Sequence, residues 1–313
     1  MSFGSRALEA NESDAASAWN DSLSPHESLA IVCTMKRTLA VLLLTLGCRP
    51  PAAPAPPPAG PAVEFALYGD SRTGDDIHRE ICAALLKTEA RFVIATGDLA
   101  EDGEDTKSWE RWREITKELR AKVPYWSCRG DHDLGPSGHF DRELGVDRPY
   151  FERERDGIHF FFLDSTTDFE RGAQVKWLEE RARVSQARHK IAVFHHPPYT
   201  IKEGREERAK RIFDLIHATL ERLGFCAAFC GHDHHFFTTR RDRVRYVVTG
   251  GGGAPLYSLN PKLAKKRDRY LAFHHFVLCR SDANGITAKV YGPAGSYPEI
   301  HFVVCRHDGP VEE

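Results

Sequence analysis

The stretch VEFALYGDSR, residues 63–72, is an apolar run that ends in a glycine and an aspartate. Such a run is typical of a buried strand, and the Gly-Asp pair is typical of a turn. The same order returns as GDLAED at 97–102, GDHD at 130–133 and GHDH at 231–234, and a His-His-Pro step stands at 195–197. Because α/β sheets place ligands at the carboxyl ends of their strands, we expect these blocks to share one site. Carboxylates and imidazoles in such a cluster are what a pair of divalent cations needs.

The hydrophobic pattern alternates between strands and helices up to about residue 230 and then changes to strands alone. Strands are predicted at 63–68, 91–96, 123–128, 158–163, 190–194, 225–230, 245–249, 270–280, 286–291 and 300–305. Helices are predicted at 77–87, 108–119, 174–184 and 212–223. This order indicates an α/β fold, a four-layer αββα sandwich of two mixed β-sheets flanked by helices.

Composition limits the possible partners. The chain has 313 residues, 41% of them apolar, and a formal net charge of −2, so a substantial core is expected and no specific nucleic-acid binding is inferred. Cys226 and Cys230 lie in one predicted strand, where residues four apart are roughly 13 Å from each other, too far for a disulfide between them. We expect both cysteines to be small buried hydrophobic residues.

The N-terminal region has the order of an export signal. Met35-Lys36-Arg37 is basic, and the apolar run that follows is about 9 residues long, whereas a membrane span needs ~20. Residues 35–48 are therefore predicted to be a signal peptide. Gly47-Cys48 resembles a bacterial lipoprotein processing site, and residues 49–62 form a proline-rich linker.

The predicted organisation has five parts. Residues 1–34 are a spurious or disordered extension, 35–48 the signal peptide, 49–62 the linker, 63–305 the folded domain and 306–313 a C-terminal tail. We expect an exported bacterial protein, either a membrane-tethered lipoprotein or periplasmic, that meets the membrane only through its lipid anchor. The alternative is a cytosolic protein with a disordered tail.

The four blocks and the His-His-Pro step resemble the calcineurin-like metallophosphoesterases over roughly residues 63–305. The pattern of that family runs D-x-H, G-D-x-x, G-N-H-D/E, H and then G-H-x-H. Two positions depart from it. Arg72 stands where the family usually has His, and Asp131 stands where it usually has Asn.

The resemblance implies hydrolysis of a phosphate ester by a hydroxide held between two divalent metal ions, with Mn, Fe and Zn all open. The substrate would be a phosphorylated small molecule or macromolecule, and the choice of monoester or diester would depend on loops such as 199–210 and 257–269. One ion would be bound by Asp70, Asp98 and His234. The other would be bound by Asp98, Asp131, His195 and His232.

The resemblance also assigns roles around the metal ions. His132 would donate a proton to the leaving group, and Asp133 would hold its imidazole. His195 rather than His196 is the expected ligand, because the family's ligand stands two residues before a proline, here Pro197. His196 would then be a supporting or structural residue.

Arg72 leaves several possibilities open, because a guanidinium cannot bind a metal ion. Glu101, three residues after Asp98, stands at the spacing where purple acid phosphatases carry a metal-binding Tyr, and it either replaces the lost ligand or faces solvent. The missing Tyr argues against a purple ferric centre. Arg72 could hold a phosphate oxygen. Alternatively, the first metal site is weak or empty, and the chain is a degenerate member that binds a phosphorylated ligand or partner without turnover. Arg72 and Asp131 add opposite charges, so we also expect them to compensate each other.

Overall fold

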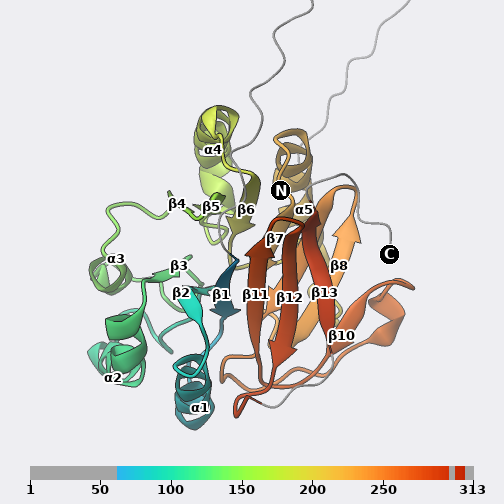
Figure 1. Ribbon diagram of the computed structural model, residues 1–313. Coiled ribbons are helices and arrows are strands. Elements are labelled where there is room, and N and C mark those ends of the chain that lie inside the picture. The colour runs from blue at the N-terminus through green and yellow to red at the C-terminus, as the bar shows by residue number, and fades with distance from the viewer. Residues whose placement is uncertain (1–61, 296–299, 307–313) are drawn as a thin grey trace, which may run out of the picture. The chain divides into compact units, whose positions relative to one another are not determined.

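The structure, a computed structural model, describes residues 62–295 and 300–306. Two mixed β-sheets pack face to face and carry helices on their outer faces (Figure 1). The predicted four-layer fold is therefore confirmed. The signal peptide, the N-terminal extension and nearly all of the linker and tail that the sequence predicts lie outside the described residues. In the part of the chain that is described, no helix has both the length and the apolar composition needed to cross a bilayer.

The first sheet has six strands in the order β13-β12-β11-β1-β2-β3. Their bounds are β1 (Val63–Tyr68), β2 (Ala90–Ala95), β3 (Tyr125–Ser127), β11 (Phe276–Asp282), β12 (Gly285–Tyr291) and β13 (His301–Arg306). Strands β1, β2 and β3 are parallel, while β11, β12 and β13 form an antiparallel meander that joins the sheet at β1. Figure 1 shows these last three strands side by side.

The second sheet has seven strands in the order β10-β8-β9-β7-β6-β5-β4. Their bounds are β4 (Phe151–Arg155), β5 (Ile158–Phe162), β6 (His189–Val193), β7 (Ala227–Cys230), β8 (Phe236–Arg241), β9 (Val244–Thr249) and β10 (Arg269–Leu271). Strands β5, β6, β7 and β9 are parallel, β4 and β8 run antiparallel to them, and β10 pairs antiparallel with β8.

Each sheet has its own pair of covering helices. Helices α1 (Asp75–Leu85) and α2 (Thr106–Lys122) pack on the six-stranded sheet, and α4 (Ala173–Val184) and α5 (Glu206–Arg222) pack on the seven-stranded sheet. Figure 1 shows the two pairs in different parts of the fold. The short helices lie in connections: α3 (His139–Leu144), η1 (Asp168–Gly172) and η2 (Pro261–Leu263).

Alternation along the central strands explains why their sequences are apolar throughout. In β1, Phe65 and Leu67 enter the core between the sheets, whereas Ala66 and Tyr68 face the helices. Successive strand residues point to opposite faces, so a strand covered on both faces has no polar side. Phe65 stacks on Phe92 of β2 with ring centroids 5.1 Å apart, which joins neighbouring strands at the centre of this core.

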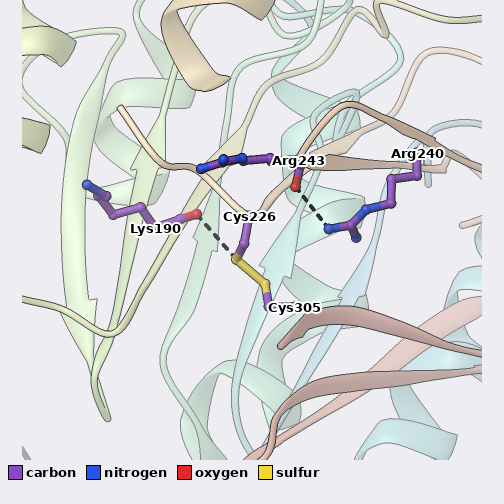
Figure 2. Close-up of a disulfide and its surroundings, with 5 residues drawn as sticks. All are labelled: Lys190, Cys226, Arg240, Arg243 and Cys305. Atoms are coloured by element: carbon purple, nitrogen blue, oxygen red, sulfur yellow. Dashed lines mark hydrogen bonds between the residues drawn. A yellow bond between two sulfur atoms is a disulfide. The ribbon is translucent and has the colours of Figure 1, made fainter. Parts of the chain in front are cut away.

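A disulfide joins the two sheets and corrects the prediction that Cys226 is a free buried residue. Cys226, just before β7, is bonded to Cys305 of β13, with a Cα–Cα distance of 5.5 Å (Figure 2). The Cys226 sulfur also lies 3.6 Å from the carbonyl oxygen of Lys190. Spacing along the sequence relates Cys226 only to Cys230, its neighbour in the predicted strand. The true partner is 79 residues away and is brought close only when the sheets pack.

Other differences have a similar origin. The predicted strand 270–280 is two strands, because the chain leaves the seven-stranded sheet after β10 and enters the six-stranded sheet at β11. A single apolar run thus serves both sheets. Strands β4 and β8 were not predicted. Strand β4 (FERER) is charged after its first residue, and β8 (FFTTRR) has only two apolar residues and ends in two arginines, so neither shows a long apolar run.

Candidate metal centre

The predicted site residues gather where strands of both sheets end. They follow the strands in this order: Asp70 after β1, Asp98 after β2, Asp131 after β3, His195 after β6, and His232 and His234 after β7. Backbone hydrogen bonds tie these loops together. The amide of Asp70 donates to Gly97 O at 3.0 Å, and the amide of Gly231 donates to His195 O at 3.0 Å. The site is therefore built at one end of the sandwich by loops from both sheets.

Three of these residues hold a strained backbone. Asp70, Asp98 and His232 have φ values of 59°, 54° and 68°, in the left-handed region that favours glycine. Such a conformation costs of order 1–3 kcal/mol at a non-glycine residue and persists only where its surroundings enforce it. The loops therefore hold these three side chains in orientations that a relaxed turn would not provide.

The glycines before the candidate ligands leave room for side chains of neighbouring loops. A Cβ on Gly97, whose φ is +92°, would lie 2.7 Å from Nδ1 of His195. A Cβ on Gly130 would lie 2.1 Å from Oδ1 of Asp98. A side chain at either glycine would push a candidate ligand out of position, which explains the repeated Gly-Asp order in the sequence.

The first group of candidate ligands consists of Asp70, Asp98 and His234, which bring their donor atoms within 4.8 Å of one another. All three side chains are buried. Nδ1 of His234 lies 2.8 Å from the carbonyl oxygen of Pro255 and donates to it, so Nε2 keeps its lone pair. That Nε2 lies 3.4 Å from Oδ1 of Asp70. A carbonyl that fixes the tautomer of a histidine in this way is typical of a metal-binding imidazole.

The second group surrounds a single oxygen, Oδ1 of Asp131. Nε2 of His195 lies 3.0 Å from it, Nδ1 of His232 lies 3.2 Å from it, and Nε2 of His196 lies 3.5 Å from it. His195 Nε2 also lies 3.3 Å from Oδ1 of Asp98. Asp98 therefore stands between the two groups, in the position of a bridging ligand.

These distances fit a cation among the donor atoms. Ligands at about 2.1 Å from a metal ion lie roughly 3.0–3.4 Å from one another in octahedral or tetrahedral geometry. The nitrogen-to-oxygen distances around Asp131, from 3.0 to 3.5 Å, match that spacing. His195 adds a second observation. Its Nδ1 lies 2.7 Å from Thr96 O, while its buried Nε2 has no hydrogen-bond partner of acceptable geometry among the described residues.

The carboxylates beside His195 favour a positive charge on its imidazole. Burial opposes a charge on this imidazole, but Asp98 and Asp131 raise its pKa well above the usual range. Burial also opposes ionisation of Asp98, yet His195 lowers the pKa of that carboxyl to about 2. Burial and the neighbouring His195 and His232 lower the pKa of His196 to about 2, so this imidazole is neutral and able to bind a cation.

Arg72 makes a specific set of contacts at the first group. Its Nε donates to Oδ2 of Asp98 at 3.3 Å, and its NH1 donates to Oε2 of Glu101 at 2.9 Å. Burial opposes its charge, but the bond to Glu101 and the charge of Asp98 raise the pKa of Arg72. In this structure Glu101 forms an ion pair with Arg72, and its side chain is 42% exposed.

His132 lies beside Asp98, to which its backbone amide donates a hydrogen bond, but Asp133 does not hold the His132 ring. Nδ1 of His132 lies 2.7 Å from the carbonyl oxygen of Glu101, which takes the place expected for Asp133. The buried carboxylate of Asp133 instead accepts hydrogen bonds from the backbone amides of Asp98, Leu99, Ala100 and Gly130. Asp133 thus fixes the loop that carries Asp98, and its predicted contact with His132 is corrected.

Three residues of this site did not stand out in the sequence as ligands or as substrate contacts. His196 was expected to be supporting or structural, yet it joins Asp131 and His232 in one group of potential ligands. Tyr257 stacks on His234 with ring centroids 4.2 Å apart, and Arg205 donates to its hydroxyl oxygen at 3.1 Å. His196 was visible in the sequence as the second His before two prolines. Tyr257 and Arg205 had no signal beyond their place in the predicted substrate loops.

Comparison with known families agrees with this geometry. The model of the calcineurin-like phosphoesterases matches residues 71–236, which is more than half of the chain. The chain therefore belongs to the calcineurin-like phosphoesterase family. No curated protein matches the sequence significantly.

Several solved structures share the fold at low sequence identity. A purple acid phosphatase, PPD1 from yellow lupin (Lupinus luteus) seeds, is 14% identical with a TM-score of 0.66, covering 77% of this chain and 54% of its own. The chain thus spans about half of the lupin enzyme. GAP50, described as the anchor in the inner membrane complex of Plasmodium, is 14% identical with a TM-score of 0.63, covering 78% and 89%. A dimetal phosphatase from Danio rerio is 14% identical with a TM-score of 0.54, covering 80% and 100%. At these identities the likeness shows the fold.

Proposed function

We propose that this protein is a hydrolase that cleaves a phosphomonoester or phosphodiester at a dinuclear metal centre. One observation carries the proposal: three imidazole nitrogens converge on Oδ1 of Asp131, beside the buried group of Asp70, Asp98 and His234. Membership of the calcineurin-like phosphoesterases supports it. Asp98, which stands in both groups, is the bridging ligand in this proposal.

When bound, two divalent cations supply Lewis acidity to the phosphoryl group and activate water as the nucleophile. The chain's own residues then position the ester and manage the proton. His132 is oriented by Glu101 O at Nδ1 and by its backbone amide, which donates to Oδ1 of Asp98 at 3.0 Å. Its Nε2 is therefore the atom that donates a proton to the leaving oxygen. Arg72 adds positive charge at the first group.

A second candidate function follows from the contact of Arg72. A guanidinium that donates to the bridging carboxylate uses an oxygen that the first cation would need. In that case the protein binds a phosphorylated ligand or partner without turnover. The relative from Plasmodium, described as an anchor, gives an example of this fold in a protein named for a non-enzymatic role.

Metal analysis beside a substrate panel separates the two functions. Purified protein is stripped with a chelator, reloaded in turn with Mn, Fe or Zn, and assayed with aryl phosphomonoesters and aryl phosphodiesters. The hydrolase is expected to bind two ions per chain and to turn over at least one ester class. A folded protein that binds at most one ion and hydrolyses none of the esters would refute the hydrolase and favour the binding function.

We also propose that the protein is exported and tethered by lipid at Cys48. The disulfide between Cys226 and Cys305 supports export, because such bonds persist in oxidising compartments and are rare in the cytosol. Protein expressed from Met35 in a Gram-negative host is expected to enter the detergent phase, and Cys48→Ser is expected to release it. If both forms remain unprocessed in the cytosol, the export proposal is wrong.

A further inference from the structure

Tyr257 reaches the first group of candidate ligands from a loop that the family pattern does not use. It follows the glycine-rich segment 250–253, which comes after β9. Its ring lies nearly parallel to that of His234, with an interplanar angle of 13° and centroids 4.2 Å apart. Its hydroxyl oxygen lies 3.4 Å from Nε2 of His234. The hydroxyl oxygen therefore lies over the face of the imidazole, next to the nitrogen that would bind a metal ion.

The hydrogen bonds around the hydroxyl settle which group donates. Arg205 NH2 donates to the Tyr257 oxygen at 3.1 Å, so this oxygen acts as an acceptor toward Arg205 and its hydrogen is directed elsewhere. Nδ1 of His234 donates to Pro255 O, so Nε2 has a lone pair and no hydrogen. That lone pair lies in the imidazole plane, whereas the stacked hydroxyl lies above the plane, so the 3.4 Å contact with Nε2 leaves the hydroxyl hydrogen without a strong acceptor.

The lone pair of His234 Nε2 is free for a metal ion, and the Tyr257 hydroxyl lies beside that nitrogen. A cation bound through Nε2 uses that lone pair, and the hydroxyl then needs another acceptor. A phosphoryl oxygen is the most negatively charged acceptor that the proposed reaction brings to this position. Hydrogen bonds to charged acceptors are stronger than those to neutral ones, so a bond from the hydroxyl to a phosphoryl oxygen would be stronger than its contact with Nε2.

The surroundings hold Tyr257 in place for this contact. Arg205 is anchored by Asp233 Oδ1 and by the carbonyl of His232, each at 2.7 Å. Its guanidinium lies 4.8 Å from the centre of the Tyr257 ring, and the Lys202 ammonium lies 5.6 Å from it. Two cations thus flank the ring on the side of loop 199–210. Arg205 and Lys202 therefore add positive charge beside the hydroxyl, which favours an anionic ligand there.

We propose that Tyr257 is a substrate-binding residue that donates a hydrogen bond to a phosphoryl oxygen, with Arg205 as its positioning residue. This inference rests on the proposed phosphoesterase function. It adds a contact from the chain itself to the phosphate group, at a position outside the four sequence blocks. It also accounts for the place of loops 199–210 and 257–269 beside the site, since one residue from each forms the Arg205–Tyr257 pair.

The test is Tyr257→Phe, which keeps the stacked ring and removes only the hydroxyl. In metal-loaded protein, the variant is expected to bind orthophosphate, measured by titration calorimetry, about 10–100-fold more weakly and to lose kcat/KM by a similar factor. Metal content and melting temperature should match the wild type. Tyr150→Phe is the control, because Tyr150 packs on Trp177 beside β4, at the far edge of the seven-stranded sheet, and should behave as wild type.

The other outcomes overturn the inference in distinguishable ways. If Tyr257→Phe binds orthophosphate and turns over ester as the wild type does, the contact does not exist and the phosphoesterase function stands. If Tyr257→Phe loses metal, the hydroxyl belongs to the metal site and not to the substrate. If the metal-loaded wild type neither binds orthophosphate nor turns over any ester, the proposed function itself fails and this inference fails with it.

Discussion

Replacing Cys226 and Cys305 together by alanine should lower the free energy of unfolding by about 3–4.5 kcal/mol. The disulfide closes a chain segment of 79 residues and joins the two sheets. In the chain-entropy model, opening a loop of that length returns about 15 cal/mol/K to the unfolded chain, or about 4.5 kcal/mol at 25 °C. In a domain of this size each kcal/mol shifts the melting temperature by roughly 2–4 °C, so a decrease of about 10 °C is expected.

The measurement is a pair of thermal melts, with and without a reducing agent, on the wild type and on the double variant. Reduction should lower the melting temperature of the wild type to that of the double variant and should leave the double variant unchanged. Cys279→Ala provides the matched control, because Cys279 is a free thiol in the same core between the sheets. It should keep the response to reducing agent, since the Cys226–Cys305 link stays intact.

Two results would refute this reasoning. The first is a wild-type melting temperature that does not respond to reduction although mass spectrometry shows the bond to be broken. The second is peptide mapping of exported protein that finds Cys226 and Cys305 as free thiols. The second result would also remove the disulfide as support for export.

The remaining predictions concern the metal centre. Asp98→Asn should lose metal and turnover together in a folded protein, because Asp98 stands in both ligand groups; retention of two ions would show that it does not bridge. His132→Ala should keep both ions and lower turnover by roughly 10²–10⁴, with a smaller loss for esters that have good leaving groups, and a uniform loss along an aryl phosphate series would exclude the proton-donor role. A double-mutant cycle of Arg72→His and Asp131→Asn should show a coupling of ~0.5–3 kcal/mol in kcat/KM if the two departures compensate each other. Additive losses would show that the two departures are independent. The same cycle with Arg72→His and Glu101→Gln measures the ion pair that the structure contains.

Local pattern was enough to predict most of the fold. Strand β1 was predicted with its observed bounds, because an apolar run followed by Gly-Asp marks both the buried strand and its end. Apolar runs that end in Gly-Asp, in the His-His-Pro step and in Gly-His likewise located β2, β6 and β7 to within two residues at either end. They also fixed the end of the sandwich at which the site residues meet, since each candidate ligand directly follows a strand.

Contacts between distant segments were beyond that reasoning. Cys305 meets Cys226 because β13 lies across the core from β7, and nothing in either strand indicates the partner. Asp133 was assigned to the ring next to it in sequence, whereas the folded loop brings four backbone amides to its carboxylate. A buried carboxylate takes the donors that are nearest in space, and unpaired amides of a tight loop are strong donors.

The two departures from the family pattern also show that contacts between charges could not be predicted from the sequence. Counting charges in the sequence pairs Arg72 with Asp131, because one adds a positive charge and the other a negative one. The structure gives each charge its own neighbours: Arg72 contacts Glu101 and Asp98, while Asp131 is surrounded by imidazoles. Glu101 is 42% exposed, so water screens its pairing with Arg72, and exposed ion pairs contribute only about 0–1 kcal/mol. Asp98, at 2% exposure, is the partner for which the charge of Arg72 matters most, and through that shared carboxylate Arg72 and Asp131 can still influence each other.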